Sequence, residues 1–473
     1  MSSNARVFSI HGGEISSPRS GLAAALFVLP AVATVLLFAP NQQTAWAAVA
    51  VGAYCVCLAT VPTFWMAVVL VVLIPFQNLI TGLLGGYSAN TRQAFAAWKE
   101  LLLLIGILRC LYHSENRRQI VAANRWVLFW CGLLMLTYCF AFLRTPSIAA
   151  FFALNIEIRF VGVLLFFMFL RLDEEHTVLL LRLMIWSVGL LAVYGIIQYF
   201  WDYERLMPLV SSELISPDSQ KRLYSYSLSF LESAYAPVVA ILILFSGAAR
   251  YSKRIALWWS ALLFPCLLLT YTRSAYLGLL AGMATLCILD RVQLRRMAVI
   301  GVAATGLLCA ILLFGHDAAG GSSLGQRLQS IVSQNDESSL EHKKLMREAV
   351  QVISENPLGI GLGKYGPLAA RFAGVDKARY TENWELQVAI GAGVIGAFAF
   401  TGLTATILWS LFRRRCRENH SVALVTAAVT TFAALTLASV MIPVWFGEIP
   451  VVYVWALVGM ALATCRGERL AFL

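Results

Sequence analysis

The stretch "LLLTYTRSAYLGLLAGMATLCILD", residues 267–290, sets an arginine between two apolar runs. A guanidinium group is costly beside hydrocarbon unless it faces water, an ionic partner or a bound anion. Arg273 therefore belongs at a tight turn between two membrane helices, at one surface of the bilayer. Which surface it faces depends on the topology of the rest of the chain.

The composition is that of a polytopic membrane protein. Of 473 residues, 59% are hydrophobic and 13% are charged, with a mean hydropathy of +0.75. Soluble domains carry roughly 45–50% apolar and about 25% charged residues. Because lipid cannot satisfy free backbone groups, spans of this kind are helices. We therefore predict an all-α, polytopic transmembrane helix bundle of about 12–14 spans, with a long and partly helical outer loop.

The apolar runs place the predicted spans near residues 21–39, 44–62, 63–82, 97–112, 126–143, 149–170, 178–198, 233–249, 255–272, 274–290, 297–315, 387–411, 421–443 and 450–464. The first run is long and has no small-residue cleavage site after it, so we interpret it as a retained helix rather than a signal peptide.

The net charge of +11 reports topology rather than a nucleic-acid partner. Every second loop is basic, which marks the cytoplasmic side of a membrane protein. This orientation puts both termini inside and "TYTRSA" at the outer face. The basic clusters are Arg117, Arg118 and Arg125; Arg250, Lys253 and Arg254; Arg291, Arg295 and Arg296; Arg413, Arg414, Arg415 and Arg417; and Arg466 and Arg469.

Cysteine and histidine usage gives no sign of a disulfide framework or a metal centre. The ten cysteines fall in apolar runs or beside the basic loops, and the six histidines form no H-x-x-H pair. We expect no metal and no cofactor.

Two long loops are predicted on the outer side, over residues 199–232 and 316–386. The second contains a predicted helix, since Ser338 and Glu341 have capping-box spacing and "ENPLGIG" ends the helix. Its apolar stripe predicts that the helix lies at the membrane surface or packs over the bundle. The stripe consists of Leu345, Ala349, Val352 and Ile353.

Four outer-face motifs occur in a fixed order: "KRLYSYSLSFLESAYAP" (221–237), "TYTRSA" (270–275), "EHKKLMREAVQVISENPLGIGLGKYG" (341–366) and "YTENWELQVAIGAGVIG" (380–396). Together they resemble the O-antigen ligase and polysaccharide polymerase superfamily over roughly residues 150–400. We accordingly divide the chain into N-terminal membrane helices (1–148), a catalytic region that includes both outer loops (149–411) and C-terminal membrane helices (412–473).

The resemblance implies a metal-independent glycosyltransferase at the outer, periplasmic face of the bacterial cytoplasmic (inner) membrane. Such enzymes move a glycan from undecaprenyl diphosphate to an acceptor hydroxyl, with inversion at the anomeric carbon. Polymerases use a second lipid-linked repeat unit as acceptor, and ligases use lipid A core. A flippase and a chain-length regulator are the implied protein partners, beside membrane lipid.

In this resemblance Arg222 and Arg273 bind the donor diphosphate. The alternatives are a solvated loop charge for Arg222 and, for Arg273, a side chain that extends to lipid phosphates at the membrane surface. The chemistry agrees, because a guanidinium presents a planar fork of donors that matches phosphate oxygens. Two such groups can stabilise the charge that grows on the leaving group, as a metal ion does in other transferases. Hydroxyl donors are available nearby from Thr270, Thr272 and Ser274.

The catalytic base departs from the family pattern, because the histidine–asparagine pair of the ligases reads Glu382 followed by Asn383 here, with Gly393 and Gly396 after it. A carboxylate can accept the proton of the acceptor hydroxyl, and Asn383 is a candidate contact to the substrate. His342, where relatives carry an arginine, is a second candidate base or a diphosphate contact. An exposed histidine on a helix surface is the alternative.

Two further pairs are candidates for substrate binding. Glu157 and Arg159 lie in span 149–170 but on different helix faces, so each needs another partner. By resemblance Arg159 lines the donor cavity, and an interhelical salt bridge is the alternative. Lys364 and Tyr365 follow the glycine turn and either contact sugar or phosphate or are displayed at the surface.

Three functions remain open. The first is a polymerase for exopolysaccharide, capsule or O-antigen. The second is a ligase, which the glutamate at the histidine position makes less favoured. The third is a lipid-linked glycan transporter or flippase, for which sites near the midplane and repeated halves are typical. The distinctive charges here gather at one face, which favours an enzyme.

Overall fold

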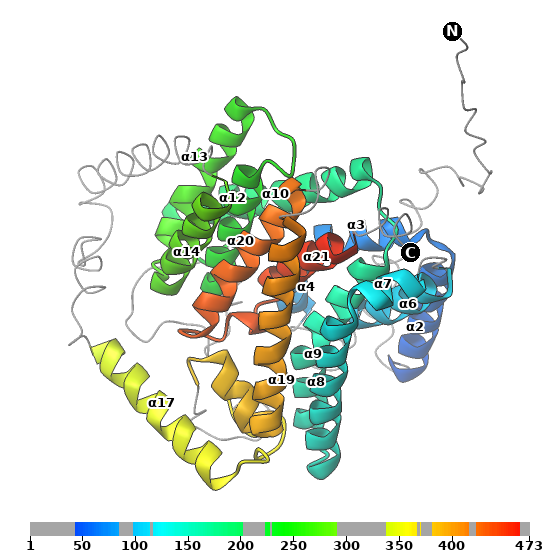
Figure 1. Ribbon diagram of the computed structural model, residues 1–473. Coiled ribbons are helices and arrows are strands. Elements are labelled where there is room, and N and C mark those ends of the chain that lie inside the picture. The colour runs from blue at the N-terminus through cyan, green and yellow to red at the C-terminus, as the bar shows by residue number, and fades with distance from the viewer. Residues whose placement is uncertain are drawn as a thin grey trace.

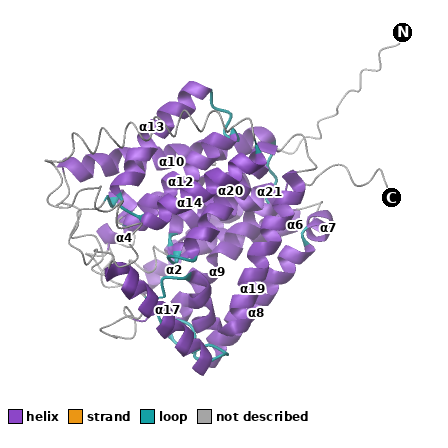
Figure 2. Cartoon of the chain, turned by 60° about the vertical axis from the view of Figure 1, so that its left-hand side comes forward, coloured by secondary structure: helices purple, strands orange, loops and turns teal. Residues whose placement is uncertain are grey.

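The computed structural model describes residues 43–84, 98–113, 117–201, 223–227, 229–290, 337–366, 369, 381–415 and 422–463. Every regular element in these ranges is helical, which confirms the predicted all-α class (Figure 1; Figure 2). The α-helices are α2 (Gln43–Thr60), α3 (Thr63–Leu73), α4 (Gln77–Leu84), α6 (Trp98–His113), α7 (Arg117–Ala123), α8 (Arg125–Arg144), α9 (Ile148–Phe169), α10 (Glu174–Trp201), α12 (Phe230–Ser246), α13 (Lys253–Leu269), α14 (Arg273–Leu289), α17 (Glu337–Glu355), α19 (Trp384–Arg415), α20 (Val422–Ser439) and α21 (Glu448–Ala463). Short 3₁₀ turns are η1 (Ile74–Phe76), η4 (Ser225–Ser227) and η5 (Val444–Phe446).

Within the described ranges, six helical segments are long and apolar enough to cross a membrane. They are Thr63–Thr81, Arg125–Arg144, Ala149–Phe169, Glu174–Trp201, Trp384–Arg415 and Val422–Ser439, with α12, α14 and α21 as shorter apolar helices. The protein is therefore a multi-pass membrane protein. The predicted spans 21–39 and 297–315 lie outside the described residues, so the total number of spans stays a prediction.

Helix α21 lies at the centre of the bundle (Figure 1). All residues 449–462 are buried, as expected for a helix that is apolar on every side. It packs closely along α9 because Gly459 has no side chain. A Cβ atom there would lie 2.8 Å from the carbonyl oxygen of Leu164 and 2.8 Å from Cβ of Phe167.

The opening motif folds as the predicted helical hairpin of α13 and α14. Helix α14 lies close against α20, since a Cβ on Gly278 would come 3.1 Å from the carbonyl oxygen of Ala434 and 3.5 Å from Cβ of Ala438. Gly282, one turn further along α14, also faces Ala434. The two helices run in opposite directions, so Arg273 lies level with the end of α20.

One end of the bundle gathers these termini, and we call it the Arg273 end: the ends of α8, α13 and α20 and the starts of α9, α12, α14, α19 and α21. Hydrogen bonds join them, for example from Tyr235 to Ser274 and from Asn383 to the carbonyl of Val440. At the opposite end, Arg250 pairs with Glu174, and three more arginines bind backbone or side-chain oxygens. These are Arg182, Arg414 and Arg415.

The predicted outer-loop helix exists as α17, which begins at Glu337, one residue before the predicted cap. Ala349 from its apolar stripe packs against Tyr365 and Ile390, with Val352 and Ile353 beside them. The prediction that this helix packs over the bundle is confirmed, because Ile390 belongs to α19.

Helix α19 is broken at Gly393, where φ is 83° and ψ is 173°. The chain after α17 restores the backbone pairing: the amide of Val394 donates to the carbonyl of Pro357 at 2.9 Å, and the amide of Ile360 donates to the carbonyl of Ile390 at 2.8 Å. Since buried backbone groups require partners, the "NPLGIG" turn and the break in α19 form together.

Gly359 is the residue on which this contact depends. Its φ is +78°, and a Cβ atom would lie 2.6 Å from the amide nitrogen of Gly393. We expect Gly359→Ala to destabilise the protein by about 1–3 kcal/mol, from backbone strain and steric overlap. Thermal unfolding of detergent-purified protein measures this effect. Gly52→Ala is the control, because no atom lies within 4 Å of its added Cβ. Equal melting of the two variants would contradict the packing described.

Candidate functional site

The turn between α13 and α14 is tight. Tyr271 takes a left-handed conformation with φ of 51°, and α14 starts two residues later at Arg273. Arg273 is partly buried, while its neighbours Thr272 and Ser274 are buried. The side chain of Thr272 makes no capping hydrogen bond to α14.

The predicted hydroxyl donors of this turn are engaged within the protein. Thr270 donates to the carbonyl of Leu267 at 2.6 Å, and Thr272 donates to the carbonyl of Thr270 at 3.3 Å. Ser274 accepts a hydrogen bond from the hydroxyl of Tyr235 at 2.8 Å. These hydroxyls stabilise the conformation of the turn, and Arg273 is the charged side chain that the turn carries.

Arg222 lies outside the described residues, but the chain directly after it is in contact with this turn. The amide of Leu223 donates to the carbonyl of Leu269 at 3.0 Å. Leu269 is the last residue of α13, four positions before Arg273.

Residues 223–227 are buried inside the bundle, although they were predicted as the last part of an outer loop. The amide of Ser225 donates to Oε1 of Gln198, and its hydroxyl donates to the carbonyl of Leu191. The hydroxyl of Tyr226 reaches the carbonyl of Ser187 at 2.8 Å. This segment therefore enters the bundle along α10 before α12 begins.

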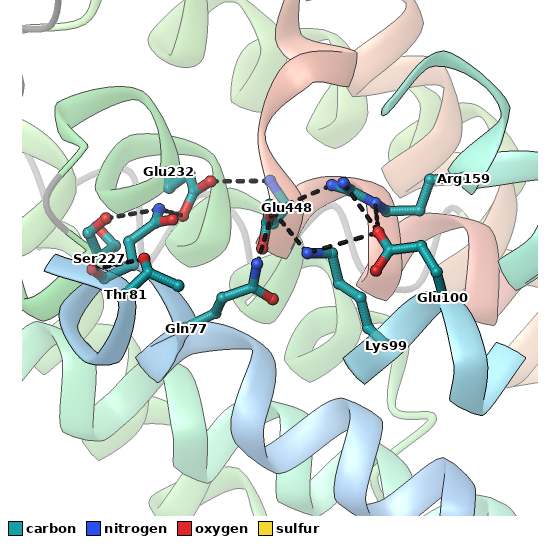
Figure 3. Close-up of polar contacts among 9 residues, drawn as sticks. Gln77, Thr81, Lys99, Glu100, Arg159, Ser227, Glu232 and Glu448 are labelled. Atoms are coloured by element: carbon teal, nitrogen blue, oxygen red, sulfur yellow. Dashed lines mark hydrogen bonds and ion pairs between the residues drawn. The ribbon is translucent and has the colours of Figure 1, made fainter. Parts of the chain in front are cut away.

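A network of buried charges lies beside this segment, and we call it the charged cluster (Figure 3). Its members come from five helices that are distant in sequence. They are Gln77 and Asn78 of α4, Lys99 and Glu100 of α6, Arg159 of α9, Glu232 of α12 and Glu448 of α21.

Oε1 of Glu448 is the centre of the charged cluster. It lies 3.1 Å from Nζ of Lys99 and 3.2 Å from Nη1 of Arg159, and it accepts a hydrogen bond from Nε2 of Gln77 at 3.1 Å. Arg159 also binds Oε1 of Glu100 through Nε and Nη2, each at 3.2 Å. The cations of α6 and α9 are thus held by carboxylates of α6 and α21.

Glu232 joins this network to the buried segment. Its Oε1 accepts from the backbone amide of Glu448 at 2.8 Å, and its Oε2 accepts from Nδ2 of Asn78 at 3.2 Å. The same Asn78 amide donates to the carbonyl of Ser227 at 2.8 Å. One turn further along α12, Tyr235 contacts Ser274, so α12 connects the charged cluster to the turn that carries Arg273.

The two charges of span 149–170 lie in different surroundings. Arg159 forms the interhelical salt bridges that were the alternative to donor binding. Glu157 is 2% exposed and faces Tyr138 of α8 and Gly391 of α19. Contact between Arg159 and a donor stays a prediction.

Asn383 has a structural task at the start of α19. Its Oδ1 accepts from the amide of Leu386 at 2.8 Å, and its Nδ2 donates to the carbonyl of Val440 at 3.1 Å. Glu382 precedes it and is partly buried. Glu385 accepts from the hydroxyl of Ser439 at 3.2 Å. The predicted roles of Glu382 as base and Asn383 as substrate contact stay predictions.

The remaining candidates lie in or after α17. His342 is in α17, and its side chain is outside what the structure describes. Lys364 is exposed, whereas Tyr365 is buried against Ala349 and Ile390 instead of being displayed. In the described part of the chain, no three His, Cys, Asp or Glu side chains gather as metal ligands.

The sequence analysis did not single out Lys99, Glu100, Glu232 and Glu448. A signal was present: Lys99 and Glu100 lie at the start of predicted span 97–112, and Glu448 directly precedes span 450–464. Charges at such positions need partners, because hydrocarbon is near. Which residues would pair could not be inferred from sequence.

Comparison with known proteins gives two findings. Residues 255–401 match the family model described as O-antigen ligase. The teichuronic acid biosynthesis protein TuaE of Bacillus subtilis (strain 168) is 24% identical over 326 residues, which is 59% of this chain and 67% of that protein. The family match contains the turn of Arg273, α17, the glycine turn and the break in α19. It does not contain Arg222 or the charged cluster.

Proposed function

We propose, from the premise that this chain belongs to the O-antigen ligase and polysaccharide polymerase superfamily, that it is a membrane glycosyltransferase. The family match and the teichuronic acid relative support a polysaccharide polymerase or ligase type of function. Our specific proposal is the polymerisation of oligosaccharide repeat units carried on undecaprenyl diphosphate.

The observation that carries this proposal is the setting of Arg273. It begins α14, and the N-terminus of a helix carries a partial positive charge that attracts anions. The positive charge of Arg273 and the partial positive charge of the helix N-terminus repel each other. A bound anion therefore stabilises the arginine and the helix terminus together. The guanidinium then binds the donor diphosphate in two-pronged fashion as negative charge develops on it.

The chemical step breaks the bond between the anomeric carbon and the diphosphate oxygen. An acceptor hydroxyl forms the new bond from the opposite side, which inverts the anomeric centre. Arg273 and Arg222 stabilise the departing diphosphate. Glu382 takes the hydroxyl proton, with His342 as the second candidate base. Holding both reactants together supplies much of the rate increase.

We infer the side of the membrane from the basic residues. Arg250, Arg414 and Arg415 lie at the end of the bundle opposite Arg273. Basic loops face the cytoplasm, so the Arg273 end faces outward across the bacterial cytoplasmic membrane.

The test is incubation of the purified protein with undecaprenyl-diphosphate-linked repeat units, followed by analysis of product length. Longer lipid-linked glycans support polymerisation. Transfer only to added lipid A core supports a ligase. If neither product forms, the result supports the transporter. The name of the relative, a teichuronic acid biosynthesis protein, favours polymer synthesis among these outcomes.

Glu382→Gln is expected to lower turnover by about 100-fold or more with little change in donor binding, because it removes only the proton acceptor. Steady-state kinetics beside donor-binding measurements separate these effects. His342→Ala is the matched comparison. If the Glu382 variant turns over normally and the His342 variant is slow, His342 in α17 is the base instead of Glu382.

A further inference from the structure

The charged cluster contains buried acceptor atoms that the protein leaves without a donor. Within the described part of the chain, Oε1 of Gln77, Oε2 of Glu100 and Oε2 of Glu448 are buried and have no hydrogen-bond partner. Gln77 is 3% exposed. Buried polar atoms are nearly always hydrogen-bonded, so three in one network indicate a missing group that supplies hydrogen atoms.

The charges around these atoms restrict what that group can be. A metal ion or an ammonium group would be repelled by Lys99 and Arg159, which already bind both carboxylates. A phosphate or carboxylate would meet Glu100, Glu448 and Glu232. A neutral donor is compatible with both signs, and hydroxyl groups donate to carboxylate oxygens in short, charge-assisted bonds.

The position of the cluster agrees with such a ligand. The side chains of Glu100 and Glu448 keep 21% and 14% of their surface exposed, so part of each of these two residues can be contacted from outside the network. Figure 3 shows both carboxylates directed toward Lys99 and Arg159.

The buried segment 223–227 runs between the turn of Arg273 and the charged cluster. The amide of Leu223 donates a hydrogen bond to the carbonyl of Leu269, directly before that turn. The carbonyl of Ser227 accepts a hydrogen bond from the side chain of Asn78 in the cluster. The four residue steps from 223 to 227 span at most about 14 Å, even fully extended. Helix α12 joins the same two places, since Glu232 lies one turn before Tyr235, whose hydroxyl donates to Ser274 next to Arg273.

We propose that the charged cluster is the sugar subsite, in which Glu100, Glu448 and Gln77 accept hydroxyl hydrogens of the glycan next to the donor diphosphate. This inference rests on the proposed function, since it assumes a lipid diphosphate at Arg273. It adds an element that recognises neutral, hydroxyl-bearing groups and is formed by residues outside the family match.

The experiment compares binding of two probes by full-length protein in nanodiscs: undecaprenyl diphosphate alone and the same lipid bearing one repeat unit. We expect the wild-type protein to prefer the glycan-bearing probe. Glu100→Gln and Glu448→Gln should reduce this preference about tenfold each and leave affinity for the bare lipid unchanged, because each removes one charge-assisted acceptor. Glu174→Gln is the control, because Glu174 is an exposed carboxylate paired with Arg250 at the opposite end.

Three outcomes overturn the inference. An unchanged preference in both variants would mean that the cluster holds ordered water only. Equal loss of both probes would mean that the carboxylates act through the fold. Wild-type protein that binds neither probe would remove the proposed function as well, which separates the two failures. If Glu448→Gln does not fold, Glu100→Gln decides the question, because Arg159 then keeps its contact with Glu448.

Discussion

Arg273→Ala lowers the rate of glycan transfer by about 100- to 1000-fold, the expected effect of deleting one donor that stabilises developing charge. The side chain is partly buried at the turn of a folded hairpin, and the close contact of α14 with α20 depends on Gly278 and Gly282 instead. The protein should therefore insert and fold normally. Activity is measured by the lengthening of lipid-linked glycan, and folding by size-exclusion chromatography and thermal unfolding.

The matched control is Arg254→Ala. Arg254 is exposed in the first turn of α13, so it is an arginine of the same hairpin at the opposite end. Its removal should leave transfer within about twofold of wild type, as for most exposed surface substitutions. Arg222→Ala should resemble Arg273→Ala. Near-normal lengthening by the Arg273 variant would exclude this residue from the diphosphate site.

Arg159→Ala is the change with the largest expected effect on stability, about 3–5 kcal/mol, because breaking a buried ion pair leaves its partners uncompensated. Glu100 and Glu448 would face each other with Lys99 as their remaining cation among the contacts described. Thermal unfolding in detergent should show a lower midpoint. Arg159→Lys should recover part of the loss by restoring the charge.

Arg250→Ala provides the comparison, because its ion pair with Glu174 is exposed. Exposed pairs contribute about 0–1 kcal/mol, so this variant should melt close to wild type. The experiment also distinguishes the two interpretations of Arg159. A variant that melts normally but no longer binds donor would assign Arg159 to the donor site and not to the ion-pair network.

The features that sequence predicted correctly are local ones. Apolar run length gives the helical class, the interruption at Arg273 gives the α13–α14 hairpin, and the stripe containing Ala349 gives α17 and its buried face. Each of these depends on residues a few positions apart, where helix geometry relates sequence spacing to a shared face.

The features that sequence did not predict join distant segments. Gln77 and Glu448, which form a hydrogen bond, are 371 positions apart, and no pattern pairs them. The break in α19 needs the carbonyl of Pro357 to receive the amide of Val394. Burial of Ser225 and Tyr226 depends on acceptors supplied by α10. A polar segment looks the same in sequence whether water or a helix satisfies it.

The break at Gly393 divides α19 into two segments that contact different helices. The segment before the break contacts α17 and the glycine turn, where Ile390 packs on Ala349 and accepts a hydrogen bond from the amide of Ile360. The part after the break is fastened to α8, where Trp130 stacks edge-on against Phe398. The start of α19 is also held by the end of α20, where Asn383 donates to the carbonyl of Val440 and Glu385 accepts from Ser439, so Glu382 lies where the contacts of α17 and α20 with α19 meet.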